Sequence, residues 1–130
     1  MRNTFKIYER LKREQHIDTL FRTGKAFSIL QVKFVYQVVP REAELSPARV
    51  GFSVPKKKFR RSVQRHHLRR LMLEAWRLNK KDLYAAIPAD QHLRIFILYI
   101  AREAVDFSTL QHSIQTGIKR LAETMAADNT

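Results

Sequence analysis

Hydrophobic residues recur with helical spacing near the start of the chain and with strand spacing soon after it. Residues 10–23 are predicted to form a helix because three apolar side chains share one face, namely Ile17, Leu20 and Phe21. In residues 31–38, apolar and polar side chains alternate with a period of two, which predicts a half-exposed strand. Residues 25–30 are predicted to form a strand before it.

The clearest helical pattern covers residues 62–83. One face carries the apolar side chains Leu68, Leu71, Met72, Ala75 and Leu78. The opposite arc carries the basic side chains Arg65, His66, Arg69, Arg70, Arg77 and Lys80. Leu73 and Trp76 also fall toward the polar arc, so we expect a second element to cover this helix near its C-terminal end.

The remaining pattern completes one mixed domain. Residues 49–54 and the apolar run 93–100 are predicted strands, and residues 40–47 form a loop. Asp106 or Ser108 is expected to cap a last helix. The order is helix, two or three strands, helix, strand, helix, which predicts a single α+β domain over residues 1–130. Residues 1–9 are expected to be a flexible arm and residues 126–130 to fray.

The charge of the chain indicates a polyanionic partner. Lys and Arg number 25 against 12 Asp and Glu, a net charge of +13, while 45% hydrophobic residues suffice for a core and exclude a disordered basic tail. Cysteine is absent, which excludes disulfides and thiolate metal sites. The longest apolar run is far shorter than a membrane helix requires, and no signal peptide precedes it, so we expect a cytoplasmic location.

The densest positive charge lies in residues 56–70 (KKKFRRSVQRHHLRR), which no acid interrupts. Arg offers a planar fork of donors to phosphate oxygens, and Lys offers a point charge. On a helix, Arg65 and Arg69 share a face, as do His66 and Arg70. Ordinary solvated helix faces mix signs, because like charges four residues apart cost stability. The run therefore favours nucleic-acid binding over a merely solvated surface.

The aromatic strand gives a weaker signal. Phe34 and Tyr36 could stack on bases, although taken alone they are better explained as core residues. No catalytic constellation stands out by spacing. The five histidines form no metal-binding pair on a helix, and three glycines build no phosphate loop. The isolated polypeptide does not look like an enzyme.

Three segments together are specific enough to indicate a family: residues 51–57 (GFSVPKK), 65–71 (RHHLRRL) and 74–77 (EAWR). In these segments, and in the N-terminal pattern from Arg10 to Phe21, the chain resembles the protein subunit of bacterial ribonuclease P. The resemblance covers nearly the whole chain. It implies an α/β sandwich of order αβββαβα, like the second domain of ribosomal protein S5, with a left-handed crossover around the basic helix.

The resemblance also implies a function. The enzyme removes the 5′ leader of precursor tRNA, and its RNA subunit carries the active site and the Mg²⁺ ions, so no cofactor is expected on the protein. The expected partners are that RNA and precursor tRNA with its leader, which is held in a cleft between the basic helix and the sheet. No membrane and no protein partner are expected to be required.

Site residues follow from the resemblance position by position. The expected contacts to the RNA subunit are Lys56, Lys57, Arg60, Arg61, Arg65, His66, Arg69 and Arg70. His66 and His67 stand where the family commonly has Asn and Arg, and a neutral His offers only one donor. The expected contacts to the leader are Ile17, Phe21 and Tyr36. Ile17 replaces a commonly aromatic residue, so it keeps apolar contact without stacking.

Three other functions remain open from the residues alone. A ribosomal or other structured-RNA-binding protein would need the same phosphate surface. A DNA-binding module is disfavoured because the basic helix lacks the Asn and Gln that commonly contact adenine, and no helix precedes it at helix-turn-helix spacing. A peripheral membrane protein would need outward apolar side chains beside the N-terminal cations. Sequencing of co-purified nucleic acid would separate these functions.

Overall fold

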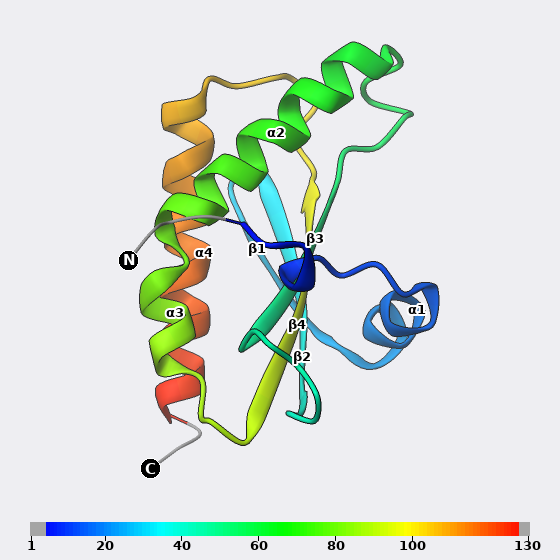
Figure 1. Ribbon diagram of the computed structural model, residues 1–130. Helices are drawn as coiled ribbons and strands as arrows, with labels where there is room; N and C mark the ends of the chain where they lie inside the picture. Colours follow the sequence, from blue (N-terminus) through cyan, green and yellow to red (C-terminus); the bar gives the residue numbers. More distant parts are fainter. Residues whose placement is uncertain (1–4, 128–130) are drawn as a thin grey trace.

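The computed structural model describes residues 5–127 of the 130-residue chain (Figure 1). Its helices are the 3-10 helix η1 (Ile7–Glu9), α1 (Glu14–Thr23), α2 (Ser62–Asn79), α3 (Lys81–Ala86) and α4 (Phe107–Ala127). Its strands are β1 (Lys25–Ile29), β2 (Val32–Pro40), β3 (Ala48–Ser53) and β4 (Gln91–Tyr99). The predicted α+β order is confirmed, with α3 as an additional short helix.

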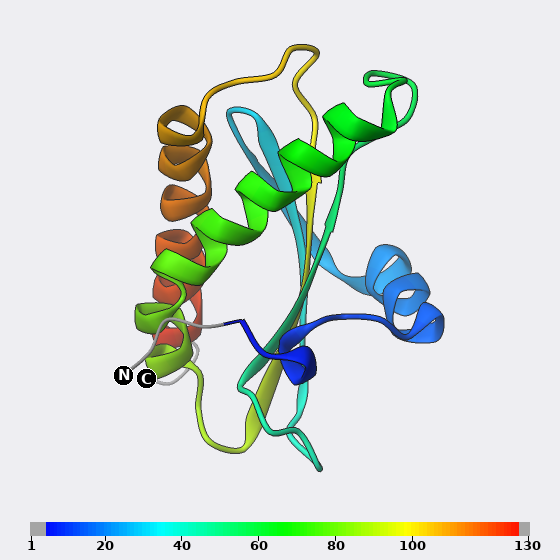
Figure 2. The same ribbon diagram turned by 45° about the horizontal axis from the view of Figure 1, so that its top comes forward.

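The four strands form one mixed sheet in the order β1-β2-β4-β3. β1 pairs antiparallel with β2, and β2 pairs antiparallel with β4. β3 runs parallel to β4, and the connection between them passes through α2 and α3. β3 is therefore an edge strand, and α2 crosses in front of it (Figures 1 and 2).

The two faces of the sheet differ, because successive side chains of a strand point to opposite sides. On β4, Leu93, Ile95 and Ile97 are fully buried and face the main core beneath α2 and α4. The half-buried Phe96 and Leu98 face the other way, where they pack with a smaller cluster on α1. Figures 1 and 2 show α1 alone on this second side of the sheet.

The predicted helix over residues 62–83 is divided into two. α2 ends at Asn79, whose side-chain amide donates to the carbonyl oxygen of Ala75 at 2.7 Å, and α3 follows after Lys80. Trp76 is fully buried, with its ring 6.3 Å from that of Tyr84 on α3, and α4 packs along α2. The expected cover over Trp76 is thus confirmed.

The helix ends agree only in part with the expectations. α1 begins at Glu14 rather than near Arg10, which instead forms a bridge with Val50 of β3. Asp106 is confirmed as the cap of α4, since its carboxylate accepts from the backbone N–H of Thr109 at 2.9 Å. The hydrogen bonds from Thr109 lower the pKa of Asp106. α4 is helical to Ala127, and the rest of the expected frayed end lies outside the described residues.

The expected N-terminal arm is docked on the domain in its described part, whereas residues 1–4 lie outside the description. Phe5 packs on Phe52 of β3, with ring centroids 6.4 Å apart. The carboxylate of Glu9, only 4% exposed, accepts from the Lys80 ammonium at 2.6 Å and from the Tyr84 hydroxyl at 2.6 Å. A buried carboxylate needs such partners, and these contacts fix η1 against the α2–α3 junction.

One glycine sets the distance between α4 and the sheet. A Cβ atom on Gly117 would lie 2.2 Å from the ring of Phe34, which is fully buried on β2. Glycine is unfavourable inside a helix by about 1 kcal/mol, but here it lets α4 approach that ring. The close approach closes the core beside Phe27, whose ring stacks on Phe34 at 5.1 Å.

Candidate nucleic-acid interface

Two cations hold the basic segment before α2 in place, one from the segment itself and one from the first turn of α2. Lys58 donates from Nζ to the carbonyl oxygen of Ile100 at the end of β4. Arg65 donates from Nη1 to the carbonyl oxygens of Phe59 at 2.8 Å and Arg60 at 2.9 Å. Because Phe59 is buried, these contacts anchor the loop on the core. Arg65, predicted as an RNA contact, thus also braces the loop.

The other predicted RNA contacts remain on the surface. The exposed members are Lys56, Lys57, Arg60, Arg61, His66, Arg69 and Arg70. Among the described residues, the ion pairs between side chains include none of them. A guanidinium nitrogen of Arg69 lies 3.4 Å from Nδ1 of His66. This basic end of α2 extends past the sheet (Figures 1 and 2), which presents its charge to a large partner.

A groove of about 840 Å³ runs between α2, β3 and the N-terminal segment. One wall is the helix, with His66, His67, Arg69 and Arg70, and the other carries Arg10 and Lys12. The apolar part of the lining comes from Phe5, Leu11, Val50, Gly51 and Phe52, together with Leu71 and Leu73 of α2. The groove therefore joins cations on both sides with an apolar and aromatic floor.

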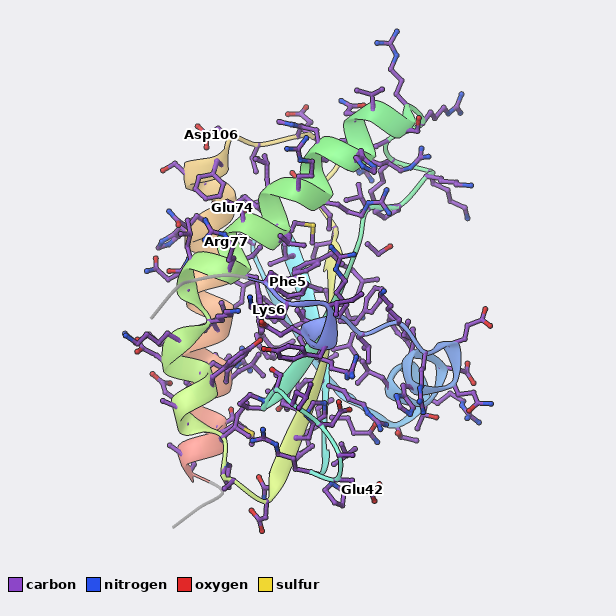
Figure 3. The ribbon with its side chains drawn as sticks, in the orientation of Figure 1. Phe5, Lys6, Glu42, Glu74, Arg77 and Asp106 are labelled. Atoms are coloured by element: carbon purple, nitrogen blue, oxygen red, sulfur yellow. The ribbon has the colours of Figure 1, made fainter. Side chains whose placement is uncertain are left out.

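The one carboxylate among the groove residues is neutralised. Glu74 accepts from Nε of Arg77 at 3.0 Å, and this bond lowers the pKa of Glu74. Figure 3 shows both residues on α2, with Phe5 and Lys6 just below the helix. Because Glu74 stays ionised and paired with Arg77, it cancels little of the positive charge that Arg69 and Arg70 present.

The predicted leader contacts are only partly brought together. Ile17 and Phe21 lie on the inner side of α1, and the ring of Phe21 meets that of Phe96 edge-to-face at 5.2 Å. Phe21 is 46% exposed, an unusual fraction for an aromatic residue in a packing contact. Ile17 packs beside it on the same cluster.

Tyr36 does not join this cluster, so the structure does not bring the three predicted leader contacts together. Its ring lies 5.9 Å from that of Phe27, and it packs on the main core under α4. The strand neighbour Val35, which is buried, faces α1 instead. The period of two separates Tyr36 from Phe21 by the full thickness of the sheet.

Sequence reasoning also missed Phe96, the centre of the patch on the α1 side. Its side chain lies across β3, where a Cβ atom on Gly51 would be 2.8 Å from the ring. Alternation along β4 puts Phe96 and Leu98 opposite the fully buried residues, and this was the available signal. Phe21, Phe96 and Leu98, with Ile17 and Val35, form what we call the aromatic patch.

We searched the described residues for a metal-binding cluster and for a membrane-spanning helix and found neither. Within residues 5–127, no three His, Asp or Glu side chains are grouped so that they could hold a metal ion. No helix in the same range is long and apolar enough to cross a membrane.

Comparison with known proteins agrees with these features. The family model described as Ribonuclease P matches residues 5–122. A ribonuclease P protein component from Porphyromonas gingivalis is 35% identical over 115 residues, covering 88% of this chain and 83% of that protein. One from Chlorobium phaeobacteroides is 36% identical over 106 residues, covering 75% and 73% respectively.

Solved structures show the same fold. The Staphylococcus aureus RNase P protein superposes with a TM-score of 0.67 at 18% identity, covering 90% of this chain and 97% of that one. The Thermotoga maritima RNase P protein superposes with a TM-score of 0.65 at 24% identity, covering 86% and 96%. Since the family model spans most of the chain and the relatives match over most of their length, this chain belongs to the family of ribonuclease P protein components.

Proposed function

We propose that this chain is the protein component of a ribonuclease P that removes the 5′ leader of precursor tRNA, with the active site on the RNA subunit. The observation that carries the proposal is the groove with cations on both walls next to the exposed basic end of α2. In this division of labour the protein supplies RNA contacts, and the Mg²⁺ ions belong to the RNA.

The basic end of α2 suits the RNA subunit. Helical side chains keep a fixed spacing, so Arg69 and Arg70 present their guanidinium groups without a large loss of backbone freedom. The anchored loop, held by Lys58 and Arg65, does the same for Lys56, Arg60 and their neighbours. Contacts of this kind bind phosphates regardless of sequence and release counterions.

The aromatic patch suits the single-stranded leader. Bases of a single strand stack on exposed aromatic side chains with little sequence preference. Phe21 offers nearly half of its surface, and Phe96 supports it from the sheet. Tyr36, committed to the opposite face, has no part in this contact.

The proposal is tested by reconstitution with the cognate RNA subunit. We expect the RNA-free protein to leave precursor tRNA intact, and we expect it to lower the Mg²⁺ concentration at which the RNA subunit cleaves. The physical reason is that Lys and Arg side chains replace part of the cation atmosphere that folded RNA requires. Metal-dependent cleavage by RNA-free protein would contradict the proposal, and so would equal affinity for an unrelated structured RNA.

Substitutions on the two faces of the sheet test which face contacts the leader. Phe21→Ala should weaken binding of precursor tRNA to the reconstituted enzyme by about 1–3 kcal/mol, the loss of one stacked base, and should leave mature tRNA unaffected. The matched control is Tyr36→Ala, which removes an aromatic ring from the other face and should alter stability but not the preference for precursor. Affinities are measured for both RNAs, with thermal melts of each variant. If only Tyr36→Ala loses the preference for precursor over mature tRNA, the leader lies on the face of the sheet that carries Tyr36, which would contradict the proposal.

A further inference from the structure

A second cavity, of about 540 Å³, lies on the α1 side of the sheet, at the end away from the basic loop. It is enclosed by the first turn of α1, the ends of β2 and β4, and the loop from β2 to β3. Figure 3 marks this loop by Glu42, far from the start of α2. None of the RNA contacts expected from the sequence lines this cavity.

One wall of the cavity is cationic and has unused donors. Arg94 of β4 lies with a guanidinium nitrogen 3.4 Å from Nε2 of His16, and its own Nε is buried without a hydrogen-bond partner. Arg13 precedes the first turn of α1, which has no side-chain cap. Burial and the positive charge of Arg94 and Arg13 lower the pKa of His16, so its imidazole is neutral at pH 7. An anion here would accept from Arg94, from Arg13 and from the helix N–H groups.

Another wall offers acceptors. His92 is fully buried, and its Nδ1 lies 3.0 Å from the carbonyl oxygen of Ser46. A carbonyl only accepts, so Nδ1 carries the hydrogen and Nε2 of the neutral ring holds a lone pair. This Nε2 has no hydrogen-bond partner and lies 3.5 Å from the carboxylate of Glu44. Two acceptors side by side require a donor between or beside them.

Glu44 is itself held in place. Its carboxylate accepts from Nε of Arg49 at 2.8 Å, and Arg49 also donates to the carbonyl oxygen of Arg10 at 2.9 Å. Arg49 is thus occupied, which leaves Lys12, Arg13 and Arg94 as the lining cations for a ligand, and of these Arg94 reaches deepest into the sheet. Burial, together with the nearby charges of Arg49 and Arg94, lowers the pKa of His92 even though Glu44 opposes the change. The acceptor on Nε2 is therefore retained at neutral pH.

We propose that this cavity binds one nucleotide unit, with its phosphate at Arg13 and Arg94 and its base donating to the wall formed by His92 and Glu44. A nucleotide combines an anionic group with N–H donors, as the two walls require, and the volume lies in the range of small-ligand pockets. Inorganic phosphate alone would leave the acceptors on His92 and Glu44 unsatisfied.

The position of the cavity favours single-stranded RNA as the source of the bound nucleotide. Arg94 and Phe96 lie on the same face of β4, two residues and so about 7 Å apart. A leader that stacks on the aromatic patch would pass the mouth of the cavity as it continues along β4. The inference thus deepens the proposed function and rests on it, adding a nucleotide site beyond the patch.

The test is a series of precursor tRNAs whose leaders lengthen one nucleotide at a time, bound by the reconstituted enzyme. Wild-type affinity should rise once when the leader covers the patch and again when it reaches the cavity. Arg94→Gln should remove the second rise, roughly tenfold or more in affinity, the effect of one charge-assisted hydrogen bond. Arg13→Gln, at the exposed rim, repeats the test where Arg94→Gln alters folding. Lys119→Gln, on the far side of α4, removes the same charge and should keep both rises.

A second arm identifies the source of the nucleotide. A 5′-nucleoside monophosphate and inorganic phosphate are titrated into the full-length protein, and NMR follows the side chains of His16 and Arg94. Shifts with the nucleotide and a second rise with RNA support a nucleotide site on the leader path, as does the second rise alone. Shifts with free nucleotide without a second rise would overturn the assignment to RNA. If the nucleotide causes no NMR shifts and the RNA series shows no second rise in affinity, the nucleotide site itself is overturned.

The two proposals fail in different ways. If the leader does not lie on the patch, Phe21→Ala will leave the first rise intact. If only the cavity is misassigned, Phe21→Ala will abolish the first rise while Arg94→Gln and Arg13→Gln behave as wild type.

Discussion

Replacement of Glu9 by Gln is expected to destabilise the folded protein by about 3–5 kcal/mol, the cost of removing one partner from a buried ion pair. Lys80 is 8% exposed and would remain in place without the carboxylate that now lies 2.6 Å from its ammonium. Total stabilities of such domains are about 5–15 kcal/mol, so the loss is a large fraction. Urea unfolding at pH 7, followed by circular dichroism, measures the change in the free energy of unfolding.

Two further variants test whether the loss of stability comes from the burial of the Glu9–Lys80 ion pair or from the loss of any ion pair. Asp18→Asn breaks the exposed pair with Arg22, whose side chains are about 70% exposed, and should cost at most about 1 kcal/mol. Adding Lys80→Met to Glu9→Gln removes the buried ammonium that has lost its carboxylate partner, and this should recover part of the lost stability. Equal effects of Glu9→Gln and Asp18→Asn would contradict the role of burial.

The same carboxylate predicts how the effect depends on pH. Burial alone would raise the pKa of Glu9, but hydrogen bonds from Lys80, Tyr84 and the Lys6 N–H outweigh it and lower the pKa below the ordinary value. The ionised form therefore favours folding at pH values above the unfolded pKa of about 4.3. This contribution is lost as the pH falls through the lower pKa of the folded state. The difference in stability between wild type and Glu9→Gln should accordingly narrow in acid.

The sequence predicts the basic helix and the α+β order well because both depend on local spacing. Leu68, Met72 and Ala75 recur at helical intervals, and each is fully buried in the fold. The docking of η1 gives no such signal, since Glu9 and Lys80 are 71 residues apart in the chain. A short polar segment with one carboxylate looks the same in sequence whether it is mobile or held.

The second feature that local sequence does not predict is which face of the sheet each side chain of β2 occupies. Tyr36 and Val35 are neighbours, and only the assignment of faces decides which one can meet α1. Tyr36 is the aromatic residue, and this favoured it in the sequence, although the fully buried Phe34 on its side of β2 belongs to the main core. A shift of one residue exchanges the two faces of a strand, and local pattern alone does not fix which face α1 covers.

Arg65 shows that the role of a cation cannot be inferred from its residue type alone and requires its contacts in the fold. In the sequence it is one cation among many in residues 56–70. In the fold its guanidinium donates to the carbonyl oxygens of Phe59 and Arg60, so its removal would release the loop as well as a charge. A test of phosphate binding by α2 must therefore leave Arg65 in place.

We expect the double variant Arg69→Gln with Arg70→Gln to bind the RNA subunit much more weakly and with a flatter dependence on salt. Both side chains are exposed on α2 and line the groove, so two phosphate contacts should be lost. Each lost contact lowers the slope of log affinity against log salt by about 0.7–0.9, so the double variant should lose about two such steps. Affinity is measured across a salt series, with circular dichroism to confirm the fold.

The matched control removes the same charge elsewhere. Arg102→Gln with Lys119→Gln changes the net charge of +13 by the same two units, and both side chains are exposed away from the groove. If the cations act through fixed positions on α2, the control should keep nearly the full slope and affinity. If they act only through the overall field of the protein, both double variants should lose equally, because that field depends on charge and distance rather than on contact geometry. Equal losses would therefore contradict a specific role of the helix.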